Sequence, residues 1–326
     1  MNVPYIDMHC DTLMQAWLKR KKDIYTLPKA MVDVQRLKQG GCMAQFFAIF
    51  MPPIKLKKYM GPFFPKDGPY IRKLHTIFQN TLKDHGDVLA PVFTGKDLEQ
   101  NAAQGKISAL LTLEDGRAVN GSLERLEEFY TMGVRLISLT WNQPNCFGSP
   151  NSDNPQVMNT GLTPFGRQAV ERMTQLGMIV DVSHLSDGGF WDVAQISSKP
   201  FVASHSNCRE LCPHRRNLTD DMLKALGEKG GVAGVNFGPE FLNQSPEDKN
   251  STNERIAVHL RHMIQKGGLE CAAFGSDFDG IKGSFETGSP KEMPRLISYL
   301  ESHGFTWEEI EHIAYKNVQR VLKECL

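Results

Sequence analysis

Short apolar runs, each of about the length of one buried strand, recur along the whole chain. They predict eight strands: Val3–Met8, Cys42–Phe50, Ile107–Leu113, Val134–Leu139, Met178–Val182, Pro200–Ser204, Gly231–Asn236 and Cys271–Ser276. Between several of them, apolar residues recur at helical spacing, which predicts the helices Leu123–Met132, Pro164–Leu176, Asp220–Lys229 and Asn253–Lys266. Alternation of strand and helix implies a parallel sheet, and eight repeats imply an α/β fold of the (β/α)8 TIM-barrel type.

Three segments interrupt this alternation. Pro52–Tyr70, Asn142–Thr163 and Gly238–Ser251 follow the second, fourth and seventh predicted strands and read as long loops. In a barrel such loops lie at the C-terminal mouth of the strands, where the active site is built. The alternative is that they are only disordered insertions. The segment Thr306–Leu322 reads as a closing helix with Trp307 and Ile310 on its buried side.

Length and charge narrow the class of protein. The chain has 326 residues, and because one barrel commonly exceeds 250 residues, we expect a single domain over residues 1–326. Hydrophobic residues make up 40% and charged residues 23%, as in ordinary globular proteins. Lysine plus arginine equals aspartate plus glutamate at 37 each, so no basic excess points to nucleic acid. A small-molecule substrate fits better.

The compartment is suggested by what the sequence lacks. The first residues show no basic segment followed by an apolar stretch, and no apolar run approaches the ~18 residues of a membrane helix, so we expect a cytoplasmic protein without a membrane segment. Seven cysteines, an odd number, favour reduced structural thiols over a disulfide framework. Cys208 and Cys212 have a spacing that zinc ligands can use, but no second cysteine pair accompanies them.

Candidate metal ligands follow five of the predicted strands. His9 and Asp11 are two residues apart, and on a strand they would project from the same face. The other candidates are Glu114 and Asp115 after the third strand, His184 after the fifth, His205 after the sixth, and Asp277 and Asp279 after the eighth. Carboxylates gathered at one rim repel each other and are costly to desolvate, whereas one or two divalent cations would remove that cost. Imidazole with carboxylate suits Zn²⁺, and Mn²⁺, Co²⁺ or Fe²⁺ can use a similar site.

Taken singly, each candidate has an ordinary structural explanation. A histidine can be hydrogen-bonded within a loop, Glu114-Asp115-Gly116 can be a solvated turn, and the aspartates near residue 278 can cap a helix. Their joint occurrence at strand ends favours the metal site. The other histidines fall away from strand ends and are assigned to surface or structural roles: His75, His85, His214, His259, His262, His303 and His312.

Seven strings in this order resemble the renal (membrane) dipeptidase family, zinc dipeptidases with a TIM-barrel fold related to the amidohydrolases. They are DMHCDT, LTLEDG, LTWN, DVSH, ASHS, HRRNLTDD and GSDFDG, and they cover essentially the whole chain. The resemblance implies that His9 and Asp11 bind one zinc ion, that His184 and His205 bind a second, and that Glu114 bridges the two.

The same resemblance implies the remaining roles. Arg216 contacts the substrate's terminal carboxylate, Asp277 handles protons, and the protein is a homodimer. Two metals can share a bridging water and supply hydroxide near neutral pH, and Mn²⁺ or Co²⁺ could substitute for zinc. The predicted activity is hydrolysis of the peptide bond of dipeptides, L,D as well as L,L. The alternatives are a deacylase or lactonase on the same barrel and a non-catalytic metal-binding protein.

One position departs from the family pattern. Many members have a histidine after the Leu-Thr of the fourth strand, whereas this chain has Trp141 followed by Asn142. An indole offers one donor and accepts no proton. Either Asn142 or a loop residue takes over the contact with the substrate, or the substrate range or the rate differs.

Overall fold

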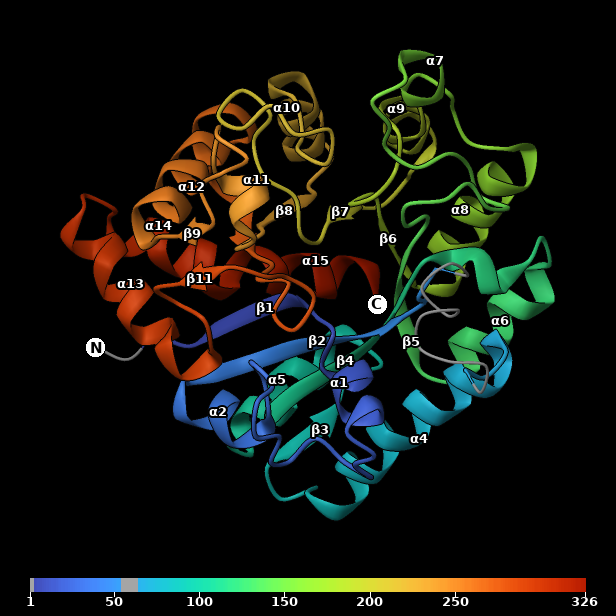
Figure 1. The fold of residues 1–326 in the computed structure, drawn as a ribbon. Coiled ribbons are helices and arrows are strands. Elements are labelled where there is room, and N and C mark those ends of the chain that lie inside the picture. Colours follow the sequence, from blue (N-terminus) through green and yellow to red (C-terminus); the bar gives the residue numbers. More distant parts are fainter. Residues whose placement is uncertain (1–2, 54–63) are drawn as a thin grey trace.

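The computed structural model describes residues 3–53 and 64–326, and its centre is a closed barrel of parallel strands (Figure 1). Going round the barrel, the strands are β1 (Tyr5–Cys10), β2 (Cys42–Phe50), β4 (Ile107–Glu114), β5 (Val134–Ser138), β6 (Ile179–Asp181), β7 (Val202–Ala203), β8 (Val232–Val235) and β10 (Ala272–Phe274). β10 pairs with β1 and closes the ring, and β2 pairs directly with β4. The predicted (β/α)8 barrel is confirmed, and each strand overlaps a predicted run. That residues 1–326 form one domain stays a prediction.

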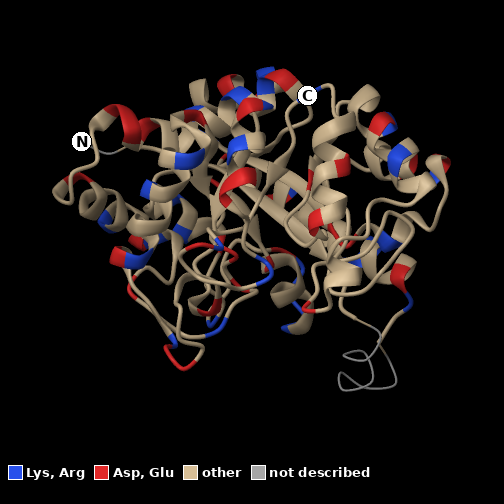
Figure 2. Ribbon diagram, turned by 90° about the horizontal axis from the view of Figure 1, so that it is seen from above, with Lys and Arg blue, Asp and Glu red and all other residues tan. Residues whose placement is uncertain are grey.

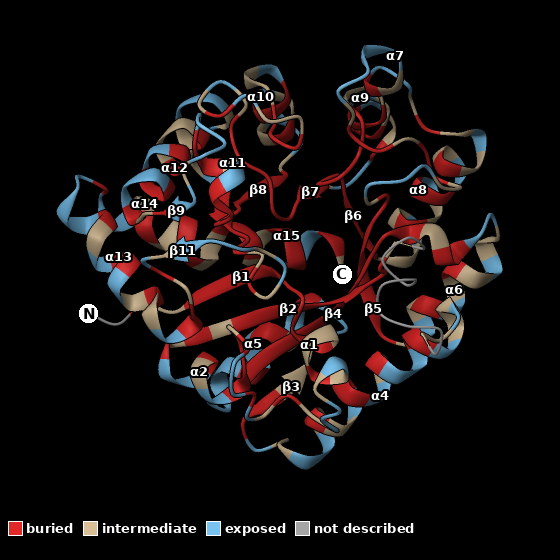
Figure 3. Cartoon of the chain, in the orientation of Figure 1, coloured by how far each residue is buried: buried red, intermediate tan, exposed pale blue. Residues whose placement is uncertain are grey.

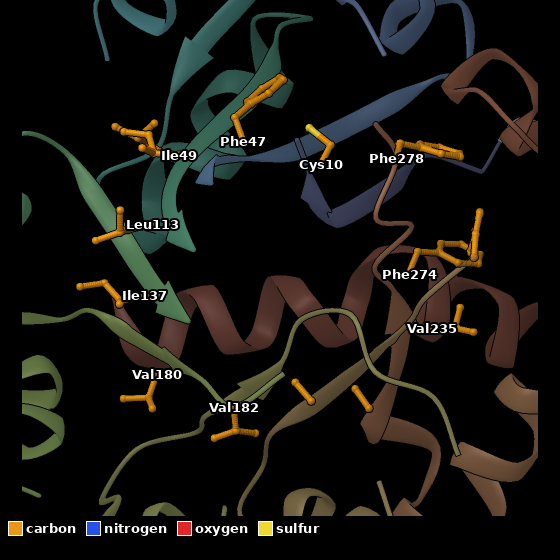
Figure 4. Close-up of a cluster of buried hydrophobic side chains, with 14 of the residues drawn as sticks. Cys10, Phe47, Ile49, Leu113, Ile137, Val180, Val182, Val235, Phe274 and Phe278 are labelled. Atoms are coloured by element: carbon orange, nitrogen blue, oxygen red, sulfur yellow. The ribbon is translucent and has the colours of Figure 1, made fainter. Parts of the chain in front are cut away.

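Alternating side chains explain why the strands close into a barrel. One set points outward and packs under the helices; it includes Phe47, Leu113, Ile137, Val180 and Phe274 (Figure 4). The other set fills the barrel interior below the mouth and includes Ile6, Phe46, Leu110, Leu136 and Ile179. Because both faces are buried, the strands appear in the sequence as continuous apolar runs. Figure 3 shows the buried strands in the centre and the exposed residues on the outer helices.

Helices surround the barrel. Their bounds are α1 (Thr12–Leu18), α2 (Val34–Gln39), α4 (Asp67–Asp84), α5 (Gly95–Ala103), α6 (Leu123–Thr131), α7 (Pro155–Met158), α8 (Pro164–Leu176), α9 (Asp187–Ile196), α10 (Asp220–Glu228), α11 (Pro239–Leu242), α12 (Asn253–Gly267), α13 (Met293–Ser302), α14 (Trp307–Glu311) and α15 (Asn317–Cys325). The four predicted helices correspond to α6, α8, α10 and α12. Each begins after a hydroxyl residue whose side chain accepts a hydrogen bond from the backbone of the first turn: Ser122, Thr163, Thr219 and Thr252.

Some local predictions need correction. The structure contains a three-residue strand that was not predicted, β3 (Leu89–Pro91). It pairs with the first residues of β4, on the same side of β4 where β5 pairs from Leu111 onward. Three residues are too short to show a strand pattern in the sequence. The predicted loop Pro52–Tyr70 ends early, because α4 begins at Asp67; residues 54–63 lie outside the described part. The other two predicted loops contain the single turns α7 and α11, and the third also contains β9 (Asn250–Ser251), which pairs with β11 (Ser284–Phe285).

The C-terminal segment is helical but not one continuous α-helix. A π-helical turn at His312–Lys316 separates α14 from α15. Ile310 is buried as predicted, but Trp307 is 37% exposed, because it lies in the first turn of α14 beside the N-cap and projects beyond the core. Val318, Val321 and Leu322 of α15 pack against the interior residues of the barrel, so this helix covers the end opposite the mouth.

The surface matches the balanced composition. Lysine and arginine are interspersed with aspartate and glutamate over the outer helices in the view from above (Figure 2). All seven cysteines are free thiols, and only Cys146 among them is not fully buried. Among the helices of residues 3–53 and 64–326, none combines the length and the apolar character that crossing a bilayer requires.

Candidate metal centre

The predicted ligands meet at the mouth of the barrel. Glu114 is the last residue of β4 and His9 lies near the end of β1, while His184, His205 and Asp277 lie two or three residues beyond β6, β7 and β10. All have at most 7% of their surface exposed apart from Asp277, which is partly exposed. Parallel strands bring their carboxyl ends to one rim, which is why residues more than 250 positions apart become neighbours.

The route by which Asp11 reaches the site differs from the prediction. β1 ends at Cys10, and Asp11 is the N-cap residue of α1 rather than a strand residue. In addition, β1 carries one extra residue opposite β2 between Asp7 and Cys10, a bulge that re-aims the end of the strand. Asp11 nevertheless places its Oδ1 4.0 Å from His9 Nε2.

Glu114 lies between His9 on one side and His184 and His205 on the other. Its Oε2 is 3.3 Å from His9 Nε2, while its Oε1 is 2.9 Å from His184 Nε2 and 3.6 Å from His205 Nε2. The two oxygens of one carboxylate therefore face opposite sides of the site. On the His9 side, His9, Asp11 and Asp277 can offer one donor atom each, all within 4.8 Å of one another, and His9, Glu114 and His205 form a second such group.

Hydrogen bonds on the outer side of two histidines fix their tautomers. His184 Nδ1 lies 3.3 Å from the Asn142 side-chain oxygen, and His205 Nδ1 lies 2.8 Å from Ser204 Oγ. The Ser204 hydroxyl donates to Asp181 at 2.6 Å, so it accepts from His205. Both histidines therefore turn an Nε2 lone pair toward the site, and these two Nε2 atoms are 3.0 Å apart. The Nε2 lone pair of His184 also accepts a hydrogen bond from Arg216 Nη2 at 3.1 Å.

The electrostatics of the site also favour a cation. Burial alone would lower the pKa of His9, but the carboxylates of Glu114 and Asp11 raise it to about 10. Burial opposes ionisation of Glu114, yet the imidazole groups around it lower its pKa. Burial lowers the pKa of His184 to about 4. Positive charge is thus stabilised near His9, Asp11 and Glu114, whereas the neutral imidazole form of His184 is favoured on the other side of the cluster.

Several buried nitrogen and oxygen atoms of the cluster have no hydrogen-bond partner among residues 3–53 and 64–326. They are His9 Nε2, Asp11 Oδ1 and Glu114 Oε2. An unsatisfied buried carboxylate oxygen is costly, and metal ligation satisfies it. The donor set of imidazole nitrogens and carboxylate oxygens is that of Zn²⁺ and related divalent ions. The residues present therefore fit a metal ion.

Not every strand-end acid joins the cluster. Asp115 accepts hydrogen bonds from Arg117 and Asn145, and Asp279 accepts from the Thr12 hydroxyl and from backbone N–H groups. Both are structural supports of the mouth. Gly280 makes the cluster compact, because a Cβ there would lie 2.4 Å from an oxygen of Asp277 and 2.5 Å from one of Asp11.

A cavity of about 440 Å³ opens above the cluster. Asn142, the predicted substrate contact, lines it, although its side-chain oxygen faces His184. His214, assigned from sequence to a surface or structural role, also lines the cavity, with its ring against Phe241 at 5.0 Å. The assignment of His214 was therefore incomplete; its position two residues before Arg216 in the same string was the available signal.

Arg216 is held in the wall of this cavity. Its Nη1 donates to Ser206 Oγ at 3.1 Å and its Nη2 to the His205 carbonyl at 3.2 Å, while the guanidinium lies 5.6 Å from the centre of the Phe241 ring. Burial lowers the pKa of Arg216 to about 10, which leaves it charged at neutral pH. Its Nε has no hydrogen-bond partner in the described part of the chain. A fixed guanidinium beside the predicted metal ligands is suited to an anionic substrate group.

A TIM barrel with this cluster at its C-terminal mouth defines a metal-dependent hydrolase. The profile of the membrane dipeptidases (peptidase family M19) matches residues 1–325, so the chain belongs to that family and is an enzyme of the metallo dipeptidase class. Among sequence relatives, a Klebsiella pneumoniae protein described as an uncharacterized protein in the pqqA 5′ region is 37% identical over 70% of this chain and 85% of its own length. An uncharacterized dipeptidase of Schizosaccharomyces pombe is 32% identical over 90% of this chain and 71% of its own.

Solved structures agree with this assignment. A metallopeptidase from Rhodobacter sphaeroides, solved with a phosphinate mimic of the dipeptide L-Ala-D-Ala, superposes with a TM-score of 0.89 at 26% identity, covering 100% of both chains. Dipeptidase AC, a metallopeptidase, gives the same TM-score and identity over 100% of this chain and 99% of its own.

Proposed function

We propose that this protein hydrolyses the single peptide bond of dipeptides, with L,D as well as L,L substrates, using two divalent metal ions, zinc in the first place. The observation that carries the proposal is the position of Glu114, whose Oε2 faces His9 and whose Oε1 faces His184 and His205. The relative solved with a dipeptide mimic supports the substrate class. His9 and Asp11 would hold one ion, His184 and His205 the other, and Mn²⁺ or Co²⁺ could substitute.

Metal ions held by these residues would polarise the scissile carbonyl and lower the pKa of a water molecule toward ~7. Asp277 is the residue that we assign to proton transfer. Its Oδ2 accepts a hydrogen bond from Asn236 at 2.8 Å, and its Oδ1 is turned toward His9 at 3.9 Å. Burial raises the pKa of Asp277, and a carboxylate at this position can take up and release a proton. It would receive the water's proton and pass it to the leaving amine.

Arg216 would bind the terminal carboxylate of the dipeptide. Its guanidinium is fixed by Ser206, by the His205 carbonyl and by His184 Nε2, so a contact with a carboxylate requires little further ordering of the side chain. This contact also explains a preference for dipeptides, because a longer peptide has no carboxylate at that distance from the scissile bond. Asn142 would orient His184 through its Nδ1 and remains our candidate for a polar substrate contact at the same rim.

The direct test is amine release from a panel of L,L- and L,D-dipeptides by the purified protein reconstituted with zinc, with metal content measured on the same sample. We expect cleavage that a chelator abolishes and that added zinc restores. Glu114→Gln should lose metal and activity together, whereas Glu124→Gln on the exposed side of α6 should lose neither. Binding of about two ions without cleavage of any dipeptide would refute the proposal, and faster cleavage of N-acyl amino acids or lactones would favour a deacylase or lactonase.

Two further expectations stay predictions. The homodimer follows from the family resemblance, and sedimentation of the purified protein would test it. The cytoplasmic location would be tested by fractionation of the cells that produce the protein.

A further inference from the structure

An aromatic pair stands beside Glu114 at the mouth of the barrel. Phe50, the last residue of β2, is in register with Glu114 on one side, and Ser138, the last residue of β5, is in register with it on the other. Trp141 follows Ser138 by three residues, and its ring meets the Phe50 ring edge to face, with centroids 5.2 Å apart. The two rings therefore lie across the end of β4, directly beside the carboxylate that joins the two ligand groups.

This aromatic pair faces the cavity. Phe50 and Trp141 both line it, and Trp141 is half-buried, so part of the indole surface is open to a bound molecule. The Trp141 ring is also 6.1 Å from the His184 ring. The carbon faces of the two rings are an apolar surface beside the predicted ligands.

The cationic side of the cavity comes from other strands. In the ring of eight strands, β7 lies four places from β2, and β10 lies four places from β5. The loop after β7 carries Arg216, and the loop after β10 carries Lys282, which is exposed at the rim. The strands that precede the aromatic pair and the strands that precede the cationic residues therefore lie on opposite arcs of the mouth, and Arg216 reaches inward to His184, where its Nη2 lies 3.1 Å from His184 Nε2.

We propose that Phe50 and Trp141 form the subsite for the side chain of the substrate's N-terminal residue, and that Trp141 makes the enzyme select dipeptides whose first residue is apolar. The inference rests on the proposed dipeptidase function. A dipeptide whose carboxylate binds Arg216 has its C-terminal residue beside Arg216 and its scissile carbonyl over the cluster. The N-terminal residue then lies on the far side, against the aromatic pair.

The test compares kcat/KM for Leu-Ala, Phe-Ala and Gly-Ala in the zinc-loaded enzyme and in variants of Trp141. A fitted apolar pocket discriminates by about 10-fold or more for each added methylene, so we expect Leu-Ala to exceed Gly-Ala by at least ~10-fold. Trp141→Ala should reduce this ratio by at least ~5-fold, because one wall of the pocket is lost. Trp141→Phe should retain most of it, since the ring and not the N–H provides the surface.

Two controls separate selectivity from general damage. The ratio of Ala-Leu to Ala-Gly, which varies the other residue, should not change in Trp141→Ala. Trp307→Ala, which removes an exposed indole far from the mouth, should leave both ratios unchanged. An unchanged Leu-Ala to Gly-Ala ratio in Trp141→Ala, or a parallel fall of both ratios, would overturn this inference while leaving the dipeptidase function standing. Absence of dipeptide cleavage in the zinc-loaded wild type would overturn both.

Discussion

Ser204 is expected to control metal affinity although it touches no metal. Its hydroxyl accepts a hydrogen bond from His205 Nδ1 at 2.8 Å and donates one to the buried carboxylate of Asp181 at 2.6 Å. Asp181 therefore fixes the direction of the Ser204 hydroxyl, and the hydroxyl in turn fixes the orientation of the His205 ring. In Ser204→Ala, His205 loses the acceptor that fixes its tautomer. Loss of such an outer contact typically weakens metal affinity by about 10- to 100-fold, or about 1.4 to 2.8 kcal/mol.

The fold should survive this change with a modest penalty. Asp181 retains the hydrogen bonds from the hydroxyls of Ser138 and Ser183, so the buried carboxylate is not left without donors. The unpaired Nδ1–H of His205 should cost about 1 to 3 kcal/mol of stability in the metal-free protein. The metal-free variant should therefore unfold cooperatively at a lower temperature rather than fail to fold.

The assay is a zinc titration against a competing chelator, with activity measured over the same range of free zinc. We expect the metal dissociation constant to rise and activity to recover when free zinc is raised. The matched control is Ser108→Ala, which removes another buried hydroxyl, hydrogen-bonded to Asn101 at 3.0 Å near the opposite end of the barrel. It should lower stability without changing zinc affinity. Equal zinc affinity of wild type and Ser204→Ala would refute the role assigned to this hydroxyl.

The remaining predictions concern the cluster and its cavity. Asp277→Asn should keep its metal but lose about 10²- to 10⁴-fold in kcat, because the amide cannot take up the proton; a near-normal kcat would remove this residue from catalysis. Arg216→Ala should raise KM by about 10- to 100-fold for dipeptides, since charge-assisted hydrogen bonds contribute about 1.5 to 3 kcal/mol, and an unchanged KM would exclude the carboxylate contact. Gly280→Ala should lower activity by about 10²-fold with little change in the melting temperature of the metal-free protein, because its Cβ would push carboxylate oxygens of Asp277 and Asp11 out of position. A large loss of stability instead would mean that Gly280 serves the fold rather than the site.

Parts of the candidate site could be predicted because, in a barrel of parallel strands, the residues that follow each strand all lie at the same mouth. Once eight strands were recognised, the residues that follow them had to lie at one rim, and His9, Glu114, His184 and His205 do so. The prediction that they are metal ligands came from the chemistry of the residue types and from the resemblance. Asp11 reached the same place by another route, as a helix N-cap beyond a bulged strand.

Other features of the site could not be predicted from the sequence of hydrophobic and polar residues around them. The link from Asp181 through Ser204 to His205 joins two strands, and the contact between Phe50 and Trp141 joins the ends of two others. Such contacts depend on strand register and on how far each loop folds back over the mouth. Neither quantity has a periodic signature in the sequence.

The sequence by itself determined the fold class, the positions of the strands and the limits of several helices. These follow from local causes: apolar runs that must be buried on both faces, apolar residues at helical spacing, and hydroxyl residues that cap the first turn. Only the tertiary structure decided which polar atoms are left without partners, which Nε2 atoms face each other, and which aromatic rings adjoin Glu114. Those relations are distances between residues far apart in the chain, and closure of the barrel is what sets them.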